Sequence, residues 1–442
     1  MNVDSAMRFL PTMSTGAWYE DRPLELRMPT SWRVTTHQPA VPPPLEDAAI
    51  VAAFAAPTGA RLGELARGRR QPLIVVDDLT RPTPVDRLLP QVLHELQSAG
   101  IGPSEVSVMV ATGTHGPASR EAAMRKIGVA GAECRVLPHN DLGAVVRLGR
   151  TSFGSRVEID PEVMRSDLLI GIGGIYPQNS AAFGGGAKLV LGVLGRRSIE
   201  DLHFGHPTDD GRYDIDNDFR RDVAEMARMA RLAFSVSAMV DQHRRLIWLG
   251  VGDQEAYYAG GVAEAKRMFT TAKPTGADVV IANAYPMDVS ATFMRSKGVI
   301  PLLHARPGAS RILIAACNEG LGHHGLFPLK PHRGLRADLQ TLRRQLRYSP
   351  GKLPGLLLGR ARSALPARGP APKQPGAPRA NRILCFITSP SADLRDGDVP
   401  GMTLFRDWER VIETVAAEQA ESSDLQVHLY PCSPLQILGD GT

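Results

Sequence analysis

Cysteine and long apolar runs are both scarce in this chain. Its four cysteines are scattered and form no CxxC pair, which argues against a zinc knuckle or a disulfide framework and fits a reducing compartment. No apolar run approaches the ~20 residues that a membrane-spanning helix requires. The N-terminus also lacks a basic head followed by an apolar stretch, the pattern of an export signal. These absences predict a soluble cytoplasmic protein with no membrane partner.

Acidic residues are almost missing from one segment, and this explains the basic character of the chain. The whole sequence carries a net charge of +5, which could suggest a nucleic-acid partner. Residues 331–380, however, hold eleven Lys or Arg against one acid, Asp338, so the rest of the chain sums to about −5. We expect residues 350–380, with seven prolines, to form a flexible insertion. The sequence therefore predicts no nucleic-acid partner.

Short apolar, β-branched runs alternate with amphipathic stretches along the chain. This alternation predicts an α/β fold, with parallel sheets covered by helices on both faces. Because 442 residues exceed one ordinary core, we expect two α/β domains, 1–270 and 271–442, with a site in the cleft between them. The expected strands lie at 72–78, 106–111, 167–173, 278–283, 311–316, 382–388 and 425–430, and the main helices at 85–99, 220–232, 255–268 and 404–420.

Three loops that follow predicted strands are rich in polar residues or glycine: DDLTRPTP from Asp77, TGTHGP from Thr112, and GGIYPQNSAAFGGGAK from Gly173. In parallel sheets, ligands gather at the loops that leave the carboxyl ends of strands. The guanidinium of Arg81 suits a carboxylate or a phosphate. The imidazole of His115 is a natural general base.

The third loop ends in three glycines followed closely by a lysine. It is not a P-loop, because Ala187 separates the last glycine from Lys188, and Leu189 follows where Ser or Thr is needed. The upstream GIGGIY is not a dinucleotide fingerprint, since Tyr176 stands in place of the third glycine. On the residues alone, the segment is either an attachment point for a cofactor or a tightly packed turn.

Two pairs of histidines could bind a metal. His203 and His206 are spaced i, i+3, but the sequence supplies no obvious full set of protein ligands. A metal there would take most of its ligands from something other than protein side chains. His323 and His324 lie in CNEGLGHHGLF, which we interpret as a glycine-rich loop rather than a site.

Together these stretches resemble the nickel-pincer lactate racemase family of 2-hydroxyacid racemases and epimerases. DDLTRPTP is similar to the family's DxTRPxP signature, TGTHGP to its GTH segment, and FGGGAK to its lysine segment. NAYPMDVSATFMRSKG, from Asn283, and CNEGLGHHGLF, from Cys317, are similar to its second domain. The resemblance runs in order from about residue 45 to 330.

The resemblance implies a cofactor. It would be a nickel-pincer nucleotide, nickel pyridinium-3,5-bisthiocarboxylic acid mononucleotide, joined covalently to Lys188. The pincer would supply three nickel donors and His203 the fourth, and the glycines would let the backbone approach the cofactor closely. Dedicated biosynthesis enzymes would have to supply it. The other expected cofactor-binding residues are Asp78, Thr80, Gly184, Gly185 and Gly186.

The resemblance also implies hydride chemistry on a 2-hydroxyacid. His115 matches a catalytic base, and Arg81 and Lys297 match residues that hold the substrate carboxylate. Two positions depart from the family pattern. Gln178 stands where a second catalytic histidine usually lies, and Met294 stands where a glutamine often contacts the carboxylate. An amide cannot accept a proton at neutral pH.

These departures predict an isomerase, a racemase or epimerase of a 2-hydroxyacid other than lactate. We expect a larger or more apolar substrate, with Phe293 and Met294 lining its pocket. One alternative is a different redox or elimination reaction with the same cofactor. The other is a non-catalytic binder of the cofactor or of hydroxyacids, which would need only Lys188 and His203 and would not explain the retained His115. The sequence leaves the oligomeric state open.

Overall fold

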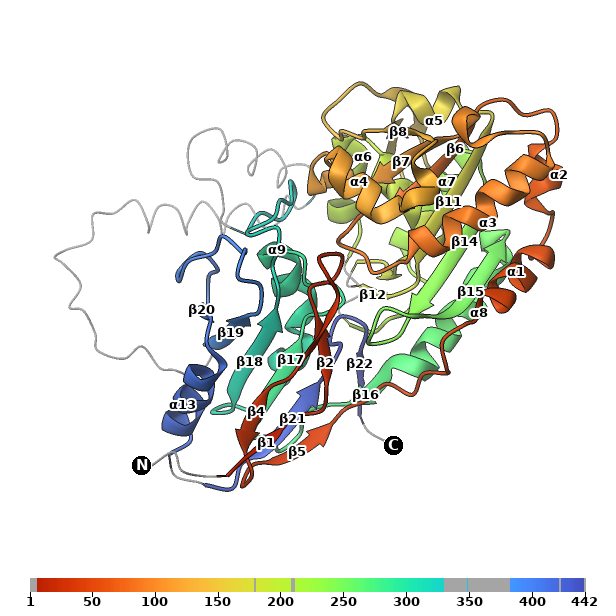
Figure 1. The fold of residues 1–442 in the computed structure, drawn as a ribbon. Helices are drawn as coiled ribbons and strands as arrows, with labels where there is room; N and C mark the ends of the chain where they lie inside the picture. Colours follow the sequence, from red (N-terminus) through yellow and green to blue (C-terminus); the bar gives the residue numbers. More distant parts are fainter. Residues whose placement is uncertain are drawn as a thin grey trace, which may run out of the picture.

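The computed structural model describes residues 6–178, 180–207, 211–329, 348, 382–420 and 423–440. Within them the chain forms two α/β units, each built on a six-stranded, largely parallel sheet with helices against it (Figure 1). The predicted fold class is confirmed. The expected insertion at 350–380 lies outside the described residues. No described helix is long and apolar enough to cross a bilayer.

The first sheet has the order β15-β14-β11-β6-β7-β8. Alternate residues of its central strand face opposite helical layers: Ile74 and Val76 pack with α1 to α4, whereas Leu73 and Val75 pack with α6 and α7. Both faces are buried, so the strand reads as a continuous apolar run. The elements are β6 Pro72–Asp77, β7 Ser107–Ala111, β8 Arg135–Leu137, β11 Leu168–Gly174, β14 Leu232–Val240, antiparallel β15 Leu246–Gly252, α1 Asp47–Ala55, α2 Leu62–Ala66, α3 Val85–Ser98, α4 Arg120–Ile127, α6 Arg196–Gly205, α7 Asp218–Met229 and α8 Gln254–Phe269.

The second sheet has the order β20-β19-β18-β17-β21-β5. Its edge strand β5 comes from the N-terminal part of the chain and pairs with β21, near the C-terminus. The division into domains 1–270 and 271–442 stays a prediction. Strand β5 precedes residue 270 in the sequence but belongs to the sheet of the second unit. The elements are β5 Arg33–Thr36, β17 Val279–Asn283, β18 Ser310–Ala315, β19 Ile383–Ile387, β20 Met402–Phe405, β21 Gln426–Tyr430, α9 Ala291–Phe293, α10 Ile300–Leu303 and α13 Trp408–Glu418.

Each predicted strand is present within one or two residues. The helix expected at 404–420 is shorter, because its first residues belong to β20 and α13 begins at Trp408, capped by the Asp407 carboxylate. The smaller elements are β1 Met7–Phe9, β2 Met13–Thr15, β3 Arg22–Leu24, β4 Arg27–Pro29, β9 Val146–Arg150, β10 Arg156–Ile159, β12 Pro177–Gln178, β13 Ala182–Phe183, β16 Thr270–Ala272, β22 Ile437–Gly439, α5 Pro161–Arg165, and the short helical turns η1 Pro103–Glu105, η2 Gly113–His115, η3 Val129–Gly131, η4 Gly186–Val193 and η5 Met294–Gly298.

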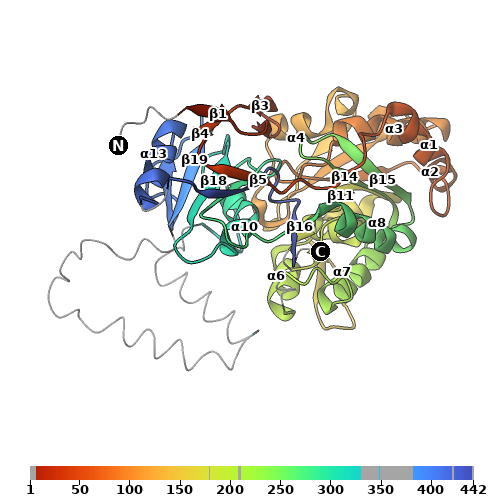
Figure 2. The same cartoon turned by 90° about the horizontal axis from the view of Figure 1, so that it is seen from below.

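The turn after β2 contacts both units. In the view of Figure 2 the red N-terminal strands extend toward the first unit. The Asp288 carboxylate, in the second unit, accepts hydrogen bonds from the backbone N–H groups of Gly16 and Ala17 at 3.1 and 3.2 Å. Asp21 then pairs with Arg244 of the first unit at 2.7 Å. The turn thus contributes to the relative position of the units.

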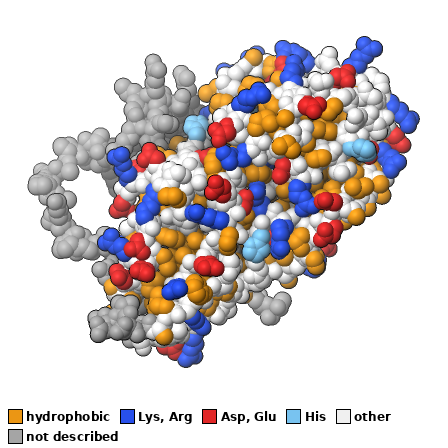
Figure 3. Space-filling model, in the orientation of Figure 1, with side chains coloured by type: hydrophobic (Ala, Val, Ile, Leu, Met, Phe, Trp, Pro, Cys, Tyr) orange, Lys and Arg blue, Asp and Glu red, His pale blue; other side chains and the backbone are white. Residues whose placement is uncertain are grey.

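Charge on the surface is mixed rather than segregated. On the face shown in Figure 3, acidic and basic side chains are interspersed among apolar and uncharged ones. No contiguous basic patch dominates that face, the feature that usually accompanies nucleic-acid binding. The absence of a nucleic-acid partner stays a prediction.

Candidate functional site

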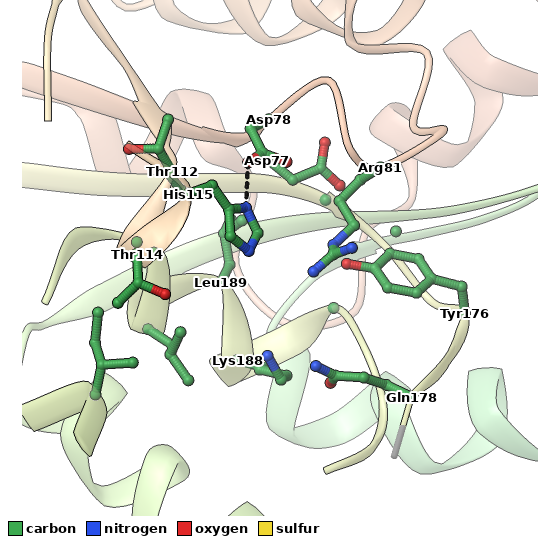
Figure 4. Close-up of a pocket in the computed structure, with 18 of the residues that line it drawn as sticks. Asp77, Asp78, Arg81, Thr112, Thr114, His115, Tyr176, Gln178, Lys188 and Leu189 are labelled. Carbon is green, nitrogen blue, oxygen red and sulfur yellow. Dashed lines mark hydrogen bonds and ion pairs between the residues drawn. The ribbon is translucent and has the colours of Figure 1, made fainter. Parts of the chain in front are cut away.

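A cleft with about 680 Å³ of empty space opens at the carboxyl ends of β6, β7 and β11 (Figure 4). Three loops that the sequence singled out meet there, because neighbouring parallel strands end at the same edge of a sheet. Residues from α6 and from the second unit complete its lining. The lining side chains that can bind or react with a ligand are Arg81, His115, Gln178, Lys188, His203 and His324.

His115 is held by a carboxylate. Its Nδ1 lies 2.6 Å from Asp78 Oδ2, while the Thr80 backbone N–H donates to Asp78 Oδ1 at 3.1 Å. Burial alone would raise the pKa of Asp78, but His115 and Arg81 outweigh it and lower that pKa. Because Asp78 is ionised, it accepts a hydrogen bond from the Nδ1–H of the ring, which leaves the His115 Nε2 lone pair for the cleft. Asp78 therefore orients the base and Thr80 contacts Asp78, while the expected role of both residues at the cofactor stays a prediction.

Arg81 points into the same space. Its guanidinium is buried, and its carbon lies 5.2 Å from the ring centre of Tyr176 and 5.9 Å from that of Phe293. Its Nη1 donates to the Thr80 carbonyl at 3.5 Å, and the guanidinium also hydrogen-bonds Tyr176. Because the described part of the chain contains no carboxylate ion-paired with Arg81, its remaining N–H groups are available to an anion. The loop that carries Arg81 is held in place by the fully buried Lys126. This lysine pairs with Asp77 at 2.7 Å and donates to the Arg81 carbonyl.

Lys188 has the properties of an amine prepared for reaction. Burial, then the positive charges of Arg81, Lys297 and Arg220, hold its pKa well below the usual value. Among the described residues no hydrogen-bond acceptor is found for its Nζ, and Figure 4 shows the side chain directed into the cleft. A neutral amine without a partner is a nucleophile that can form an amide-type bond.

The three glycines before Lys188 are explained by protein contacts. A Cβ on Gly184 would lie 2.5 Å from Tyr176, and a Cβ on Gly186, whose φ is +56°, would lie 2.7 Å from Tyr258. The Tyr258 hydroxyl also donates to the Gly184 carbonyl at 2.8 Å. Only Gly185 lines the cleft. Packing against the two tyrosines thus explains why Gly184 and Gly186 are glycines, and their expected role in cofactor binding stays a prediction.

The two histidines of α6 have different environments. His203 lines the cleft, and its Nδ1–H donates to the Ile199 carbonyl at 3.0 Å, which leaves Nε2 free as a ligand. Burial and Lys188 lower the pKa of His203 to about 3, so the ring is neutral. His206 instead pairs with the buried Asp222 at 2.7 Å. The i, i+3 pair does not form a metal site.

Gln178 lies in the cleft as expected. The side chain is buried, and its Oε1 has no hydrogen-bond donor in the described part of the chain. A buried amide oxygen without a donor is costly unless a bound molecule supplies one. Gln178 is thus suited to contact a ligand by hydrogen bonding, without taking up a proton.

Met294 is not in the site. It is fully buried in the second unit, with Sδ 3.4 Å from Cys317 Sγ and 3.6 Å from Cys385 Sγ. Its place in the family motif suggested the pocket, but the turn η5 directs the side chain into the core. Lys297, on the same turn, is half-buried and near enough to Arg81 to be affected by its charge.

A second hollow, with about 990 Å³ of empty space, adjoins the cleft at His115. Phe293 lies in its wall, as expected, but so do the polar side chains of Tyr19, Arg125 and Glu319. The Tyr19 hydroxyl donates to Glu319 Oε1 at 2.9 Å. The expectation of an apolar substrate pocket is therefore not supported by this lining.

Sequence reasoning missed His324. The second unit brings it into the cleft, where its ring centre lies 5.0 Å from that of His115. The neighbouring His323 faces the second hollow instead. The only signal in the sequence was the pair of histidines beside glycines, and nothing in that loop indicates that it meets the His115 loop.

No group of three or more His, Cys, Asp or Glu able to hold a metal is found in the described ranges. A metal here would depend on donors from a bound molecule, with the His203 Nε2 as a protein ligand. Such a molecule fits the lining, which holds Lys188 for covalent attachment, the neutral His203, and Arg81 for a phosphate.

The model of the lactate racemase N-terminal domain matches residues 19–212 of the chain. The chain is 28% identical over 278 residues to lactate racemase of Lactiplantibacillus plantarum, and 28% identical over 281 residues to lactate racemase of Thermoanaerobacterium thermosaccharolyticum. In both cases the match covers 60% of this chain and 65% of the relative.

The fold is also similar to solved structures. The apoprotein of lactate racemase from T. thermosaccharolyticum superposes with a TM-score of 0.66 and 20% identity, covering 97% of this chain and 100% of that one. A crystal structure of a protein from Thermotoga maritima gives 0.58 and 12%, covering 90% and 99%. Residues 19–212 of the chain thus match the lactate racemase N-terminal domain, both relatives are lactate racemases, and the solved structures share the fold.

Proposed function

We propose that this protein is a racemase or epimerase of a 2-hydroxyacid and that it works with a nickel-pincer nucleotide on Lys188. The observation that carries the proposal is the grouping in one cleft of a lysine with a lowered pKa and no hydrogen-bond partner among the described residues, a neutral histidine with a free Nε2, and a carboxylate-oriented base. Lactate racemase family members generally use this cofactor.

Two residues would hold the cofactor. Lys188 would attach it through its amine, and His203 would ligate the nickel through Nε2, because its Nδ1 proton is already committed to the Ile199 carbonyl. Burial, followed by the positive charges of Arg81, Lys297 and Arg220, holds the pKa of the Lys188 amine well below its usual value. When bound, the cofactor supplies a reversible acceptor for the α-hydrogen of the substrate as hydride.

The remaining residues act on the substrate. Arg81 binds its carboxylate with two parallel N–H groups, and Lys297 adds a second positive charge. His115 takes the hydroxyl proton at Nε2, and the Asp78 carboxylate, 2.6 Å from Nδ1, stabilises the imidazolium that results. Gln178 contributes a hydrogen bond.

We propose a substrate larger than lactate. With one histidine replaced by Gln178, the cleft differs from the expected two-base arrangement, and the hollow beyond His115 offers room for a larger substituent. The polar side chains of that hollow favour a substituent with hydrogen-bonding groups. A simple binder of the cofactor would have no use for the Asp78–His115 pair.

The test is conversion of single-enantiomer 2-hydroxyacids by protein co-produced with the enzymes that make the cofactor, followed by chiral chromatography. We expect loss of optical purity for at least one acid. Unchanged enantiomers across a broad panel, with cofactor bound, would contradict the proposal; formation of an oxidised or dehydrated product would favour the alternative redox or elimination reaction.

The same assay gives a pH profile with a defined sign. His115 must be neutral to accept a proton, and burial lowers its pKa below the usual 6.5, so the acidic loss of kcat/KM should begin below that pH. Lys297 must be protonated to bind a carboxylate, and burial and Arg81 lower its pKa to about 7, so kcat/KM should fall above pH 7. In Lys297→Arg the alkaline fall should disappear; an unchanged profile would exclude Lys297 as its source.

A further inference from the structure

We infer that His324 is a further catalytic residue, which donates its Nε2–H to the oxygen of the substrate hydroxyl whose proton goes to His115. The inference rests on the proposed function, since it concerns the same cleft and the same hydroxyacid. It is carried by the hydrogen bonds of the His324 ring and by its position beside His115.

The tautomer of His324 follows from its partners. The backbone N–H of Leu326 lies 3.4 Å from Nδ1, and the Thr114 hydroxyl lies 3.2 Å from the same atom. A backbone N–H can only donate, so Nδ1 is the acceptor and the single proton of the neutral ring is on Nε2. No partner for that Nε2 is found among the residues described, and the side chain lines the cleft.

His324 remains neutral, so it can donate a hydrogen bond without adding a positive charge beside the nearby cation Arg81. Burial, followed by His115 and His203, lowers its pKa to about 2. The ring therefore stays neutral at neutral pH and keeps one N–H to donate. A neutral imidazole of this kind can stabilise negative charge that develops on a substrate oxygen.

His115 and His324 are complementary. His115 donates its Nδ1–H to the Asp78 carboxylate and presents the Nε2 lone pair, whereas His324 presents an Nε2–H. Their ring centres are 5.0 Å apart with planes at 69°, close enough for both to reach one oxygen atom. A hydroxyl group donates once and accepts from a second partner, so it satisfies both rings at the same time.

Phe293 holds this arrangement from the second unit. Its ring meets His115 edge-on at 4.7 Å and stacks on His324 at 6.1 Å. His324 and Phe293 come from the second unit, and His115 comes from the first. The two imidazoles are consequently close to each other only in this arrangement of the two units. Recognition of the hydroxyl therefore depends on that arrangement.

The experiment measures binding rather than turnover, by calorimetry on the cofactor-loaded protein, with 2-hydroxybutyrate and butyrate as probes. The difference between them isolates the hydroxyl. For the wild type we expect roughly 10-fold or greater preference for the hydroxyacid, the size of one hydrogen bond in a desolvated site. His324→Phe, which keeps the stacking on Phe293, should reduce this preference to about 2-fold or less while butyrate affinity changes little.

Thr114→Val provides a second variant that keeps the ring but removes one partner of Nδ1, and it should reduce the preference by a smaller factor. His94→Phe, at an exposed histidine of α3 that lines neither the cleft nor the second hollow, is the control and should keep the wild-type preference. If His324→Phe weakens both acids equally, the residue is merely structural and the inference is overturned. If it retains the full preference, the inference also fails, although the proposed function stands. If the wild type binds neither acid, nor any longer 2-hydroxyacid, the proposed function fails with it.

Discussion

Asp78→Asn should lower kcat by roughly 10²- to 10⁴-fold while the protein still folds and binds its cofactor. The Asp78 carboxylate accepts a hydrogen bond from the His115 Nδ1–H at 2.6 Å and so leaves Nε2 as a base. An asparagine amide can donate to Nδ1 instead, which moves the ring proton to Nε2 and removes the base. Steady-state kinetics on the preferred hydroxyacid measures the loss.

The control for this variant is Thr80→Ser, which keeps the hydroxyl beside Asp78 and should retain most activity. A nearly unchanged kcat in Asp78→Asn would show that the His115 tautomer does not matter and that another group takes the hydroxyl proton. Reduced cofactor content in the same variant would instead restore Asp78 to the cofactor-binding role that the family resemblance suggested.

Arg81→Lys should reduce kcat/KM by about 10- to 100-fold, even though the positive charge is kept. The Arg81 guanidinium lies against Tyr176 and is directed into the cleft, where its planar fork can bind both carboxylate oxygens. A lysine ammonium provides a point charge without that geometry. The loss should appear mainly in kcat if carboxylate orientation governs the reaction and mainly in KM if affinity alone does.

Arg87→Lys, at a half-exposed arginine on α3, is the matched control and should behave like the wild type. A substrate analogue with an uncharged amide in place of the carboxylate should be insensitive to Arg81→Lys. Equal activity of Arg81→Lys and the wild type on the acid would indicate that Lys297 binds the carboxylate without help.

Much of the fold could be predicted because its strands are buried on both faces and read as short apolar runs. The runs around Ile74, Ile170 and Ile281 became central strands of the two sheets. The edge strands were harder. Nothing local marks β5 (Arg33–Thr36) as a partner of β21, because that pairing joins segments almost 400 residues apart.

The candidate site was predictable where one loop after one strand carried the signal. Arg81, His115 and Lys188 were found this way, and the structure brings them together in the cleft. Side-chain direction was not predictable. Met294 and Lys297 lie on one turn, yet Met294 enters the core, and only the three-dimensional arrangement of η5 decides this.

His324 could not be predicted for a different reason. Its loop follows a strand of the second sheet, and its meeting with the His115 loop depends on how the two units pack. Likewise, the glycines before Lys188 avoid Tyr176 and Tyr258, which are distant from one another in sequence. A motif shows which residue types are present, whereas the contacts show what each of them is for.

The most direct test of the account is intact mass together with bound nickel, for protein co-produced with the cofactor-biosynthesis enzymes, beside Lys188→Ala and His203→Ala. The account predicts a covalent adduct and about one nickel per chain in the wild type, as one attachment lysine requires. Lys188→Ala should lack the adduct, and His203→Ala should keep the adduct but lose nickel. An unmodified wild-type chain without nickel, or an adduct that persists in Lys188→Ala, would contradict it.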